Sequence, residues 1–260
     1  MKSTAALAGM LLVAAARCAV VDVPPEVTRF EVRAPDLTHP LSESYPTPSV
    51  PEDPVKKAVF EQINVDRAAH QVPPVAWDEA ASRVADVFTA AQVREGTRGH
   101  FLLDGVPPYA RTGLAGVFGM GAENSVAWRT TASAFEESPR DLALEGQASM
   151  LAEKPPDDGH RRTILDPLAT HVGVGWAQGG GDFRMAEEFL TRRLDLLTIS
   201  RAASAPLTLL FRGRTVAGEQ LRFVTLAVEP APRPMSKAHA NSLTRYTYPE
   251  PRLAFVPEGM

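Results

Sequence analysis

The chain has 260 residues, of which 44% are hydrophobic and 22% are charged, and its formal net charge at pH 7 is -4. These values are typical of a globular protein with one large domain or two ordinary ones. The small negative charge provides no basic surface for nucleic acid or for an anionic membrane, so we expect no nucleic-acid partner.

Residues 1–19 have the pattern of an export signal. Lys2 gives a short basic start, and residues 5–16 form an unbroken run of apolar residues and glycine. This run is well short of the roughly 20 apolar residues that a membrane-spanning helix needs. We therefore expect an exported protein that is secreted, periplasmic or at the cell surface, with no transmembrane segment in the mature chain.

Cys18 is the only cysteine, and it lies at the end of the export signal. A lipidated cysteine requires a small residue before it, and Arg17 is a poor fit to that requirement. Residues 14–16 are alanines and suit ordinary cleavage, so lipid anchoring through Cys18 remains the less supported alternative. In either case the mature chain has no disulfide, and its stability must come from a hydrophobic core.

The next stretch, residues 20–53, is rich in proline. Eight prolines lie between residues 20 and 54. Because each proline fixes φ and removes a backbone donor, we expect an extended tether here.

Two helices are predicted after the tether. Asp53 caps the first, in which apolar residues repeat at helical spacing over residues 54–70. Asp78 caps the second, which ends at Gly96, and His100 follows soon after. The expected inner face of the second helix consists of Val84, Val87, Phe88 and Ala91.

Residues 101–122 are rich in glycine and proline and are expected to form an irregular loop. Glu123 follows this loop directly. Ser138 begins a further helix, and Glu153 lies near the end of that helix. The expected inner face of this helix consists of Leu144, Ala148 and Leu151.

Two strands are predicted over residues 172–177 and 183–190, joined by a glycine-rich hairpin. The first strand has glycine at alternate positions, which indicates that another backbone approaches it closely. Helices packed on such a small antiparallel sheet predict an α+β, three-layer domain. Residues 194–260 contain strand-like runs separated by turns and are expected to form a small β-rich extension.

Four polar residues fall at the ends of predicted elements: His100, Glu123, Glu153 and His160. Imidazole nitrogen and carboxylate oxygen both bind zinc, so the four are candidate ligands. Alternatively, the carboxylates orient the imidazoles and leave only the histidines on a metal, or all four form a network that holds loops together. The mature chain has no cysteine nucleophile and no motif of a zinc protease helix, a serine nucleophile elbow or a phosphate-binding loop.

Several short motifs follow one another in the order seen in a known family. They are Asn64-x-x-Arg67, Pro73–Asp78, Gly99-His100, Gly121–Asn124, Gly159–Pro167 and Thr170–Gly175. The chain thereby resembles the CAP superfamily, also called SCP domains, which includes cysteine-rich secretory proteins, insect venom antigens and plant pathogenesis-related proteins. The resemblance covers about residues 54–193 and is closest to the cysteine-free bacterial branch.

The resemblance implies an α-β-α sandwich with a large open cleft. In the family two histidines and two glutamates line this cleft, and here they correspond to His100, Glu123, Glu153 and His160. In some members the histidines bind zinc or another divalent ion, which is not required for folding. This chain departs from the pattern at three places: Ala122, Met150 and Asp157-Asp158.

Two functions are compatible with this pattern. The first is an exported binding module whose cleft holds a divalent ion, a lipid, a peptide or a cell-envelope ligand. The second is a zinc-dependent hydrolase in which Glu123 or Glu153 is the general base. A catalytic zinc usually has three protein ligands, and a glutamate used as the third would be a poorer base. We therefore favour the binding module over an enzyme.

Overall fold

The computed structural model describes residues 49–199, 211–215, 224–251 and 253–255. The expected export signal, Cys18 and most of the proline-rich tether lie outside these ranges. Within them, no helix combines the length and the apolar character that crossing a membrane requires.

The first two helices begin where their caps predict. Helix α1 (Pro54–Ala69) starts after Asp53, whose carboxylate accepts hydrogen bonds from the first backbone N–H groups. Helix α2 (Glu79–Glu95) starts after Asp78 and ends at Gly96 in the left-handed conformation. Both predicted helices are confirmed.

The inner face of α2 includes small residues that the hydrophobic pattern did not select. Ala81, Ala85 and Phe88 are fully buried, whereas Val87 is 72% exposed. Val87 was therefore wrongly placed on the inner face. Small residues are buried because α2 lies almost directly on the backbone of the sheet, which leaves no room for larger side chains.

The predicted loop over residues 101–122 is confirmed only in part. Pro108 begins a short helix, α3 (Pro108–Leu114), and a long strand, β2 (Met120–Arg129), follows. Proline is well suited to the first turn of a helix, where its missing N–H is not needed. Strand β2 is stabilised by pairing along its whole length with a distant strand, which local composition does not reveal.

Helix α4 (Pro139–Leu151) is capped by Ser138 as predicted, but it turns a different face inward. Its buried residues are Leu142, Ala143, Gly146, Gln147 and Met150, and Ala148 is exposed. Two contacts explain the difference. A Cβ on Gly146 would lie only 2.8 Å from a methyl group of Val126, and the Gln147 amide donates to Asp66 at 2.9 Å. Helix α5 (Gly159–Ile164) follows.

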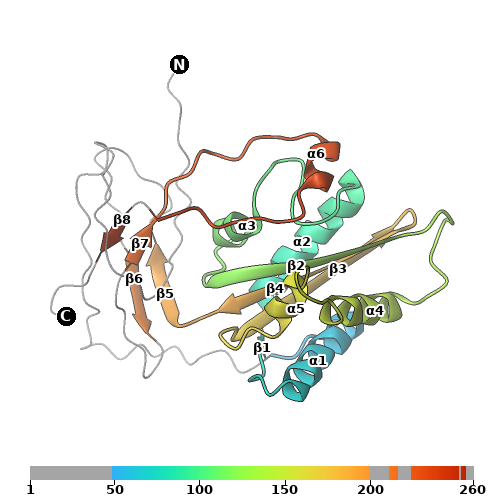
Figure 1. Ribbon diagram of the computed structural model, residues 1–260, viewed down its shortest axis with the longest axis horizontal. Helices are drawn as coiled ribbons and strands as arrows, with labels where there is room; N and C mark the ends of the chain where they lie inside the picture. Colours follow the sequence, from blue (N-terminus) through green and yellow to red (C-terminus); the bar gives the residue numbers. More distant parts are fainter. Residues whose placement is uncertain (1–48, 200–210, 216–223, 252, 256–260) are drawn as a thin grey trace.

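Four strands form one sheet in the order β1-β3-β4-β2. Strand β1 (Ala76–Trp77) is parallel to β3 (His171–Gly179), and β4 (Asp182–Thr191) is antiparallel to both β3 and β2. The predicted hairpin is thus confirmed as β3–β4. Helices α1, α4 and α5 cover one face of the sheet, and α2 and α3 cover the other (Figure 1). The domain is α+β, as expected from the sequence.

The alternating glycines of β3 let α2 approach the sheet. A Cβ on Gly173 would lie 2.2 Å from the backbone nitrogen of Ser82, and one on Gly175 would lie 2.3 Å from the carbonyl carbon of Ala85. Both distances are too short for any side chain. The close backbone approach that the sequence indicated is therefore made by α2.

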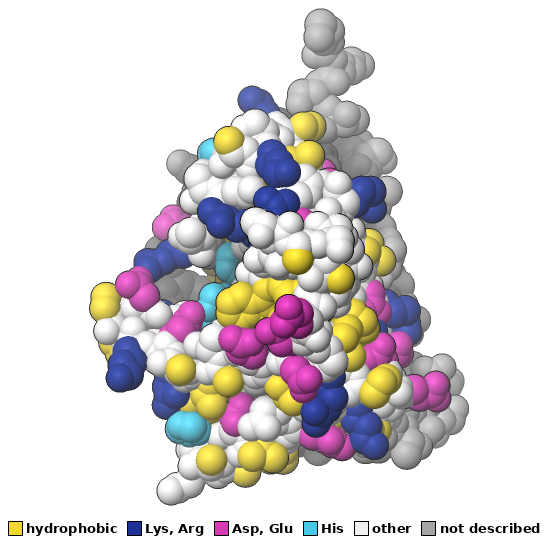
Figure 2. Space-filling model, turned by 90° about the vertical axis from the view of Figure 1, so that its right-hand side faces the viewer, with side chains coloured by type: hydrophobic (Ala, Val, Ile, Leu, Met, Phe, Trp, Pro, Cys, Tyr) yellow, Lys and Arg dark blue, Asp and Glu magenta, His cyan; other side chains and the backbone are white. Residues whose placement is uncertain are grey.

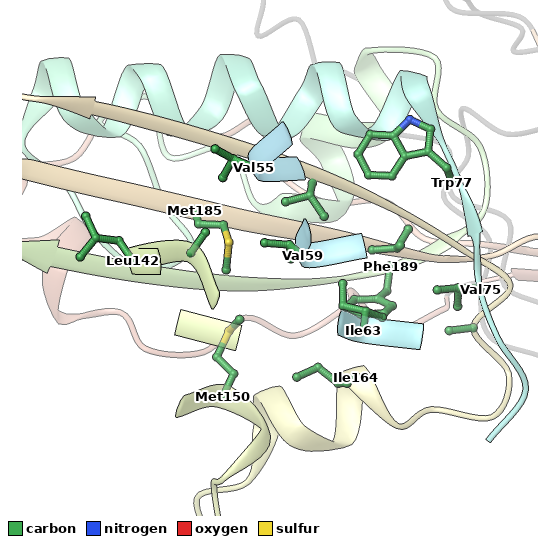
Figure 3. Close-up of a cluster of buried hydrophobic side chains, with 14 of the residues drawn as sticks. Val55, Val59, Ile63, Val75, Trp77, Leu142, Met150, Ile164, Met185 and Phe189 are labelled. Carbon is green, nitrogen blue, oxygen red and sulfur yellow. The ribbon is translucent and has the colours of Figure 1, made fainter. Parts of the chain in front are cut away.

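The largest part of the hydrophobic core lies between the sheet and the layer of α1, α4 and α5. Val59 and Ile63 of α1 meet Met185 and Phe189 of β4, and Ile164 of α5 closes the cluster (Figure 3). This packing anchors α5, which carries His160, against the rest of the domain.

Past the sandwich, the residues that the structure describes include four short strands and one helix. Strands β5 (Leu194–Ile199) and β6 (Phe211–Thr215) form one pair, and β7 (Val224–Leu226) and β8 (Leu253–Phe255) form another. Between β7 and β8 the chain returns to the sandwich through α6 (Lys237–Ser242). We call residues 229–248 the C-terminal segment.

Candidate functional site

The four candidate residues come together at the edge strand β2. His100 lies on the loop after α2, and Glu123 lies on β2 itself. Glu153 follows the end of α4, and His160 is the second residue of α5. The two imidazole rings have centroids 6.3 Å apart. The site therefore joins both helical layers across β2.

The first pair is buried. Nδ1 of His100 lies 2.9 Å from Oε1 of Glu123, and the side chains are 10% and 0% exposed. Arg111 of α3 donates a hydrogen bond to the other oxygen of Glu123. Its guanidinium also lies over the Phe88 ring, 3.7 Å from the centroid. A buried carboxylate thus has both a cationic partner and a hydrogen-bonded histidine.

Another carboxyl group lies beside the His100–Glu123 pair. Glu188 of β4 is the register partner of Glu123 and is 1% exposed. Burial raises the pKa of both carboxyls; Arg111 opposes the rise at Glu123, whereas the charge of Glu123 adds to it at Glu188. The environment therefore favours the protonated form of both carboxyls, and it does so more strongly at Glu188 than at Glu123.

His100 is neutral in this environment. Burial, together with the positive charge of Arg111, lowers the pKa of His100 to about 4. When Glu123 accepts this hydrogen bond, the proton of the neutral ring is on Nδ1 and the lone pair is on Nε2.

The second pair is closer to the surface. Nδ1 of His160 lies 2.6 Å from Oε1 of Glu153, and the backbone N–H of His160 donates to Oε2 at 2.9 Å. The two side chains are 30% and 25% exposed. Glu153 therefore holds the ring and also satisfies a free N–H in the first turn of α5.

A buried arginine fixes the segment that carries His160. Arg67 of α1 is fully buried, and its guanidinium donates to three carbonyl oxygens at the end of α5 and just beyond it: Ile164, Asp166 and Ala169. From the other side, Asn124 donates to the carbonyl oxygen of His160 at 3.3 Å. The motif residue Arg67 is thus a positioning residue for α5.

The donor atoms at this site fit a two-histidine site better than a catalytic zinc site. Both glutamates are already hydrogen-bonded to their histidines, so the Nε2 atoms of the two histidines are the atoms that remain to bind a metal. No group of three or more His, Cys, Asp or Glu side chains is arranged to hold a metal ion within the part of the chain that the structure describes. A catalytic zinc normally has three protein ligands.

An open hollow of about 600 Å³ lies beside α5, next to the site. It is lined by Ala122, Asp158, Gly159, Arg161, Arg162, Thr163, Leu165, Asp166 and Pro167. Histidine side chains (cyan) reach the surface at the rim of a hollow on the face shown in Figure 2. On the His100 side, however, the expected open cleft is covered, because the Tyr246 ring packs edge-on against His100 with centroids 5.0 Å apart.

Sequence reasoning missed three contributors to the site: Arg111, Glu188 and Tyr246. One signal was present, since two adjacent glutamates stand between the apolar pairs Met185-Ala186 and Phe189-Leu190 of β4. Charged residues in the middle of a buried strand require partners. Arg111 and Tyr246 have no comparable local signal.

Residues 60–191 match the family model of CAP, the cysteine-rich secretory protein family. The chain belongs to the CAP family. The match includes all four candidate site residues, and the fold of this CAP domain agrees with it. No curated protein is similar enough in sequence to count as a relative.

Solved structures similar to this CAP domain come from several organisms. One is an extracellular protein with an SCP domain from Bacillus anthracis: identity is 19%, the TM-score is 0.42, and the match covers 53% of this chain and 40% of that one. Another is an outer surface protein from Borrelia burgdorferi, with 14% identity, 55% and 96% coverage and a TM-score of 0.44. A third is a hookworm platelet inhibitor, with 10% identity, 55% and 72% coverage and a TM-score of 0.34. No ligand or activity follows from similarities this low.

Proposed function

We propose that this CAP protein is an exported binding module whose ligand is held by the imidazoles of His100 and His160. One observation carries the proposal: each ring is fixed through Nδ1 by a glutamate, and the rings lie 6.3 Å apart. Histidines oriented in this way present Nε2 to a ligand. A lone pair on Nε2 binds a divalent cation or accepts a hydrogen bond, so an anionic ligand is not favoured.

The hydrolase alternative has less support. A general base needs a carboxylate that can reach a water molecule. Both oxygens of Glu123 are already hydrogen-bonded, to His100 and Arg111, and both oxygens of Glu153 accept bonds from His160. The carboxylates are therefore better suited to orient the imidazoles than to activate water.

A titration with zinc tests the proposal. We expect calorimetry on the purified full chain to detect one binding event that disappears in the His100→Ala/His160→Ala double variant. His239→Ala is the matched control, because His239 is an exposed histidine on α6. Zinc uptake that persists in the double variant, or no zinc uptake by the unaltered chain, would contradict the proposal. The two histidines and two glutamates would then be a network that holds loops together.

Export is a separate part of the proposal and rests on residues 1–19. Mass spectrometry of the mature protein is expected to show a new N-terminus just after residues 14–16. A lipid-modified Cys18 at the N-terminus would instead establish a membrane anchor.

A further inference from the structure

The C-terminal segment lies against the loop that carries His100. The Met235 N–H donates to the Leu103 carbonyl oxygen at 2.9 Å, and the Arg98 N–H donates to the side-chain oxygen of Asn241 at 2.9 Å. In Figure 1 the segment passes over α3 and α2 on its way to α6 and back. Both hydrogen bonds join the segment directly to the loop between α2 and α3.

Glycines in that loop provide room for the segment. A Cβ on Gly105 would lie 2.3 Å from the carbonyl oxygen of Arg233, and Gly105 has a φ of +75°. At Gly99, next to His100, a Cβ would lie 3.4 Å from the carbonyl oxygen of Leu243. A side chain at Gly105 would therefore collide with the segment and strain the loop.

Two tyrosines of the segment bind the free edge of the sheet. The backbone N–H of Glu123 donates to the Tyr246 hydroxyl at 2.7 Å, and the Tyr248 hydroxyl donates to the carbonyl oxygen of Gly121. Strand β2 is the last strand of its sheet, so its outer edge has no strand partner there. Gly121 and Glu123 are two residues apart on β2, so their backbone groups point to the same edge. Tyr246 and Tyr248 have the same spacing and hydrogen-bond to both groups.

The rings of these tyrosines complete a half-buried aromatic cluster. Tyr246 lies edge-on against His100, and Tyr248 lies 4.9 Å from the Tyr109 ring of α3, measured between centroids. The Tyr109 hydroxyl in turn donates to Glu229 at the start of the segment, at 2.8 Å. Burial raises the pKa of Tyr246 and of Tyr248, so both hydroxyls stay neutral and able to hydrogen-bond.

We propose that the covered side of the cleft is a groove for an extended peptide with tyrosines two residues apart, and that residues 243–248 occupy it as the chain's own ligand. The inference deepens the proposed function, because it names the class of ligand that the cleft takes next to His100. Peptides that bind a sheet edge gain affinity from main-chain groups and specificity from alternate side chains. Here the tyrosine hydroxyls reach the main chain, and the rings fill the pocket.

The segment is held in a way that permits displacement. Arg245 of the segment forms an ion pair with Asp157 in which the side chains are 79% and 83% exposed, so this pair adds little to the binding. A tethered ligand nevertheless competes at a high effective concentration, on the order of mM for short flexible linkers. A free peptide should therefore bind well only after the tyrosines have been removed from the tethered copy.

Fluorescence anisotropy with a labelled peptide of residues 241–250 tests the inference. We expect this peptide to bind the full-length Tyr246→Ala/Tyr248→Ala variant at least tenfold more tightly than the unaltered chain. Thr247→Ala is the matched control, because Thr247 is exposed between the two tyrosines and its replacement should leave the groove covered. A probe peptide with both tyrosines replaced by alanine should not bind.

Two results would overturn the inference: no peptide binding by the correctly folded double variant, or equal binding by the double variant and the unaltered chain. Zinc titration of the same variant keeps the two proposals apart. Histidine-dependent zinc uptake without peptide binding leaves the proposed function intact and removes the peptide groove. Peptide binding without zinc uptake supports the groove and removes the histidine pair as the ligand site.

A milder variant provides a test if the double variant does not fold. Tyr246→Phe keeps the ring but removes the oxygen that accepts from the Glu123 N–H. Hydrogen exchange at that amide should become at least tenfold faster, while exchange in α1 stays unchanged. Unchanged exchange at Glu123 would show that the segment does not cover β2 in solution.

Discussion

The two histidine–glutamate pairs have the same chemistry but different surroundings. In the first, Glu123 is fully buried and His100 is 10% exposed; in the second, Glu153 is 25% and His160 is 30% exposed. The buried pair requires Arg111 to neutralise its carboxylate. The exposed pair requires no such partner, because water solvates it and Glu153 also caps α5.

This difference shows that the two sides of the site depend on different interactions. A buried charge is stable only with its partners in place, so the His100 side is sensitive to single substitutions. The His160 side depends on the position of α5, which Arg67 and the hydrophobic core maintain. Stability measurements can separate these two kinds of dependence.

Arg111→Met should have the largest effect, because it leaves Glu123 and Glu188 buried together without a cation. We expect the free energy of unfolding in urea at pH 7 to fall by about 3 kcal/mol. Arg162→Met is the control, since Arg162 is 74% exposed in a pair with Asp158 and should change stability by less than about 0.5 kcal/mol. An effect of Arg111→Met as small as that of the control would contradict the role given to the arginine.

Glu187→Gln examines a buried carboxyl on the opposite face of β4. Asn124 donates to Glu187 at 3.0 Å, and burial raises the pKa of Glu187 to about 8. Between pH 4.5 and 8 the unfolded chain releases this proton while the folded chain keeps it, so stability falls as pH rises. Glutamine cannot titrate, and we expect it to add roughly 2 kcal/mol of stability at pH 8 and much less at pH 5. A gain that is equal at both pH values would show that Glu187 does not hold its proton.

His100 should produce the opposite pH dependence. Its pKa of about 4 lies below the ordinary value of 6.5, because of burial and the charge of Arg111, while Glu188 opposes the shift. As pH falls from 6.5 to 4, the unfolded chain takes up a proton that the folded chain does not, so stability decreases, by roughly 1.5 kcal/mol. His100→Gln should remove this slope, and NMR titration of the ring should show a midpoint near 4 in the unaltered chain. A midpoint near 6.5 would mean that His100 is neither buried nor influenced by the charge of Arg111 in solution.

Glu153→Gln should have the smallest effect. Glutamine keeps an oxygen that accepts from the backbone N–H of His160, and it replaces the partly exposed oxygen that faces Nδ1 of His160 by an uncharged amide nitrogen. The expected loss is about 0.5 kcal/mol, measured as a small decrease in the melting temperature. A loss as large as that of Arg111→Met would show that the two pairs are equally dependent on their charges.

Features that depend on residues close together in the sequence could be predicted from it. The caps Asp53, Asp78 and Ser138 mark the helix starts because a side-chain oxygen binds N–H groups two or three residues away. The glycines after β3 mark the hairpin because the turn requires positive φ at Gly180 and Gly181. The family motifs also pointed to all four histidine and glutamate residues, although no local pattern showed how they pair.

Other features were decided only by the tertiary structure, because the residues involved are far apart in the sequence. Strand β2 is stabilised by its pairing with β4, and that register places Glu188 beside Glu123. Tyr246 reaches the Glu123 N–H across 123 residues. Neither periodicity nor composition encodes such contacts, since they arise from the packing of complete elements. The sequence alone therefore pointed to two histidines and two glutamates. The tertiary structure added Arg111, Glu188 and Tyr246, and it decided that one side of the site is buried and covered by the chain's own C-terminal segment.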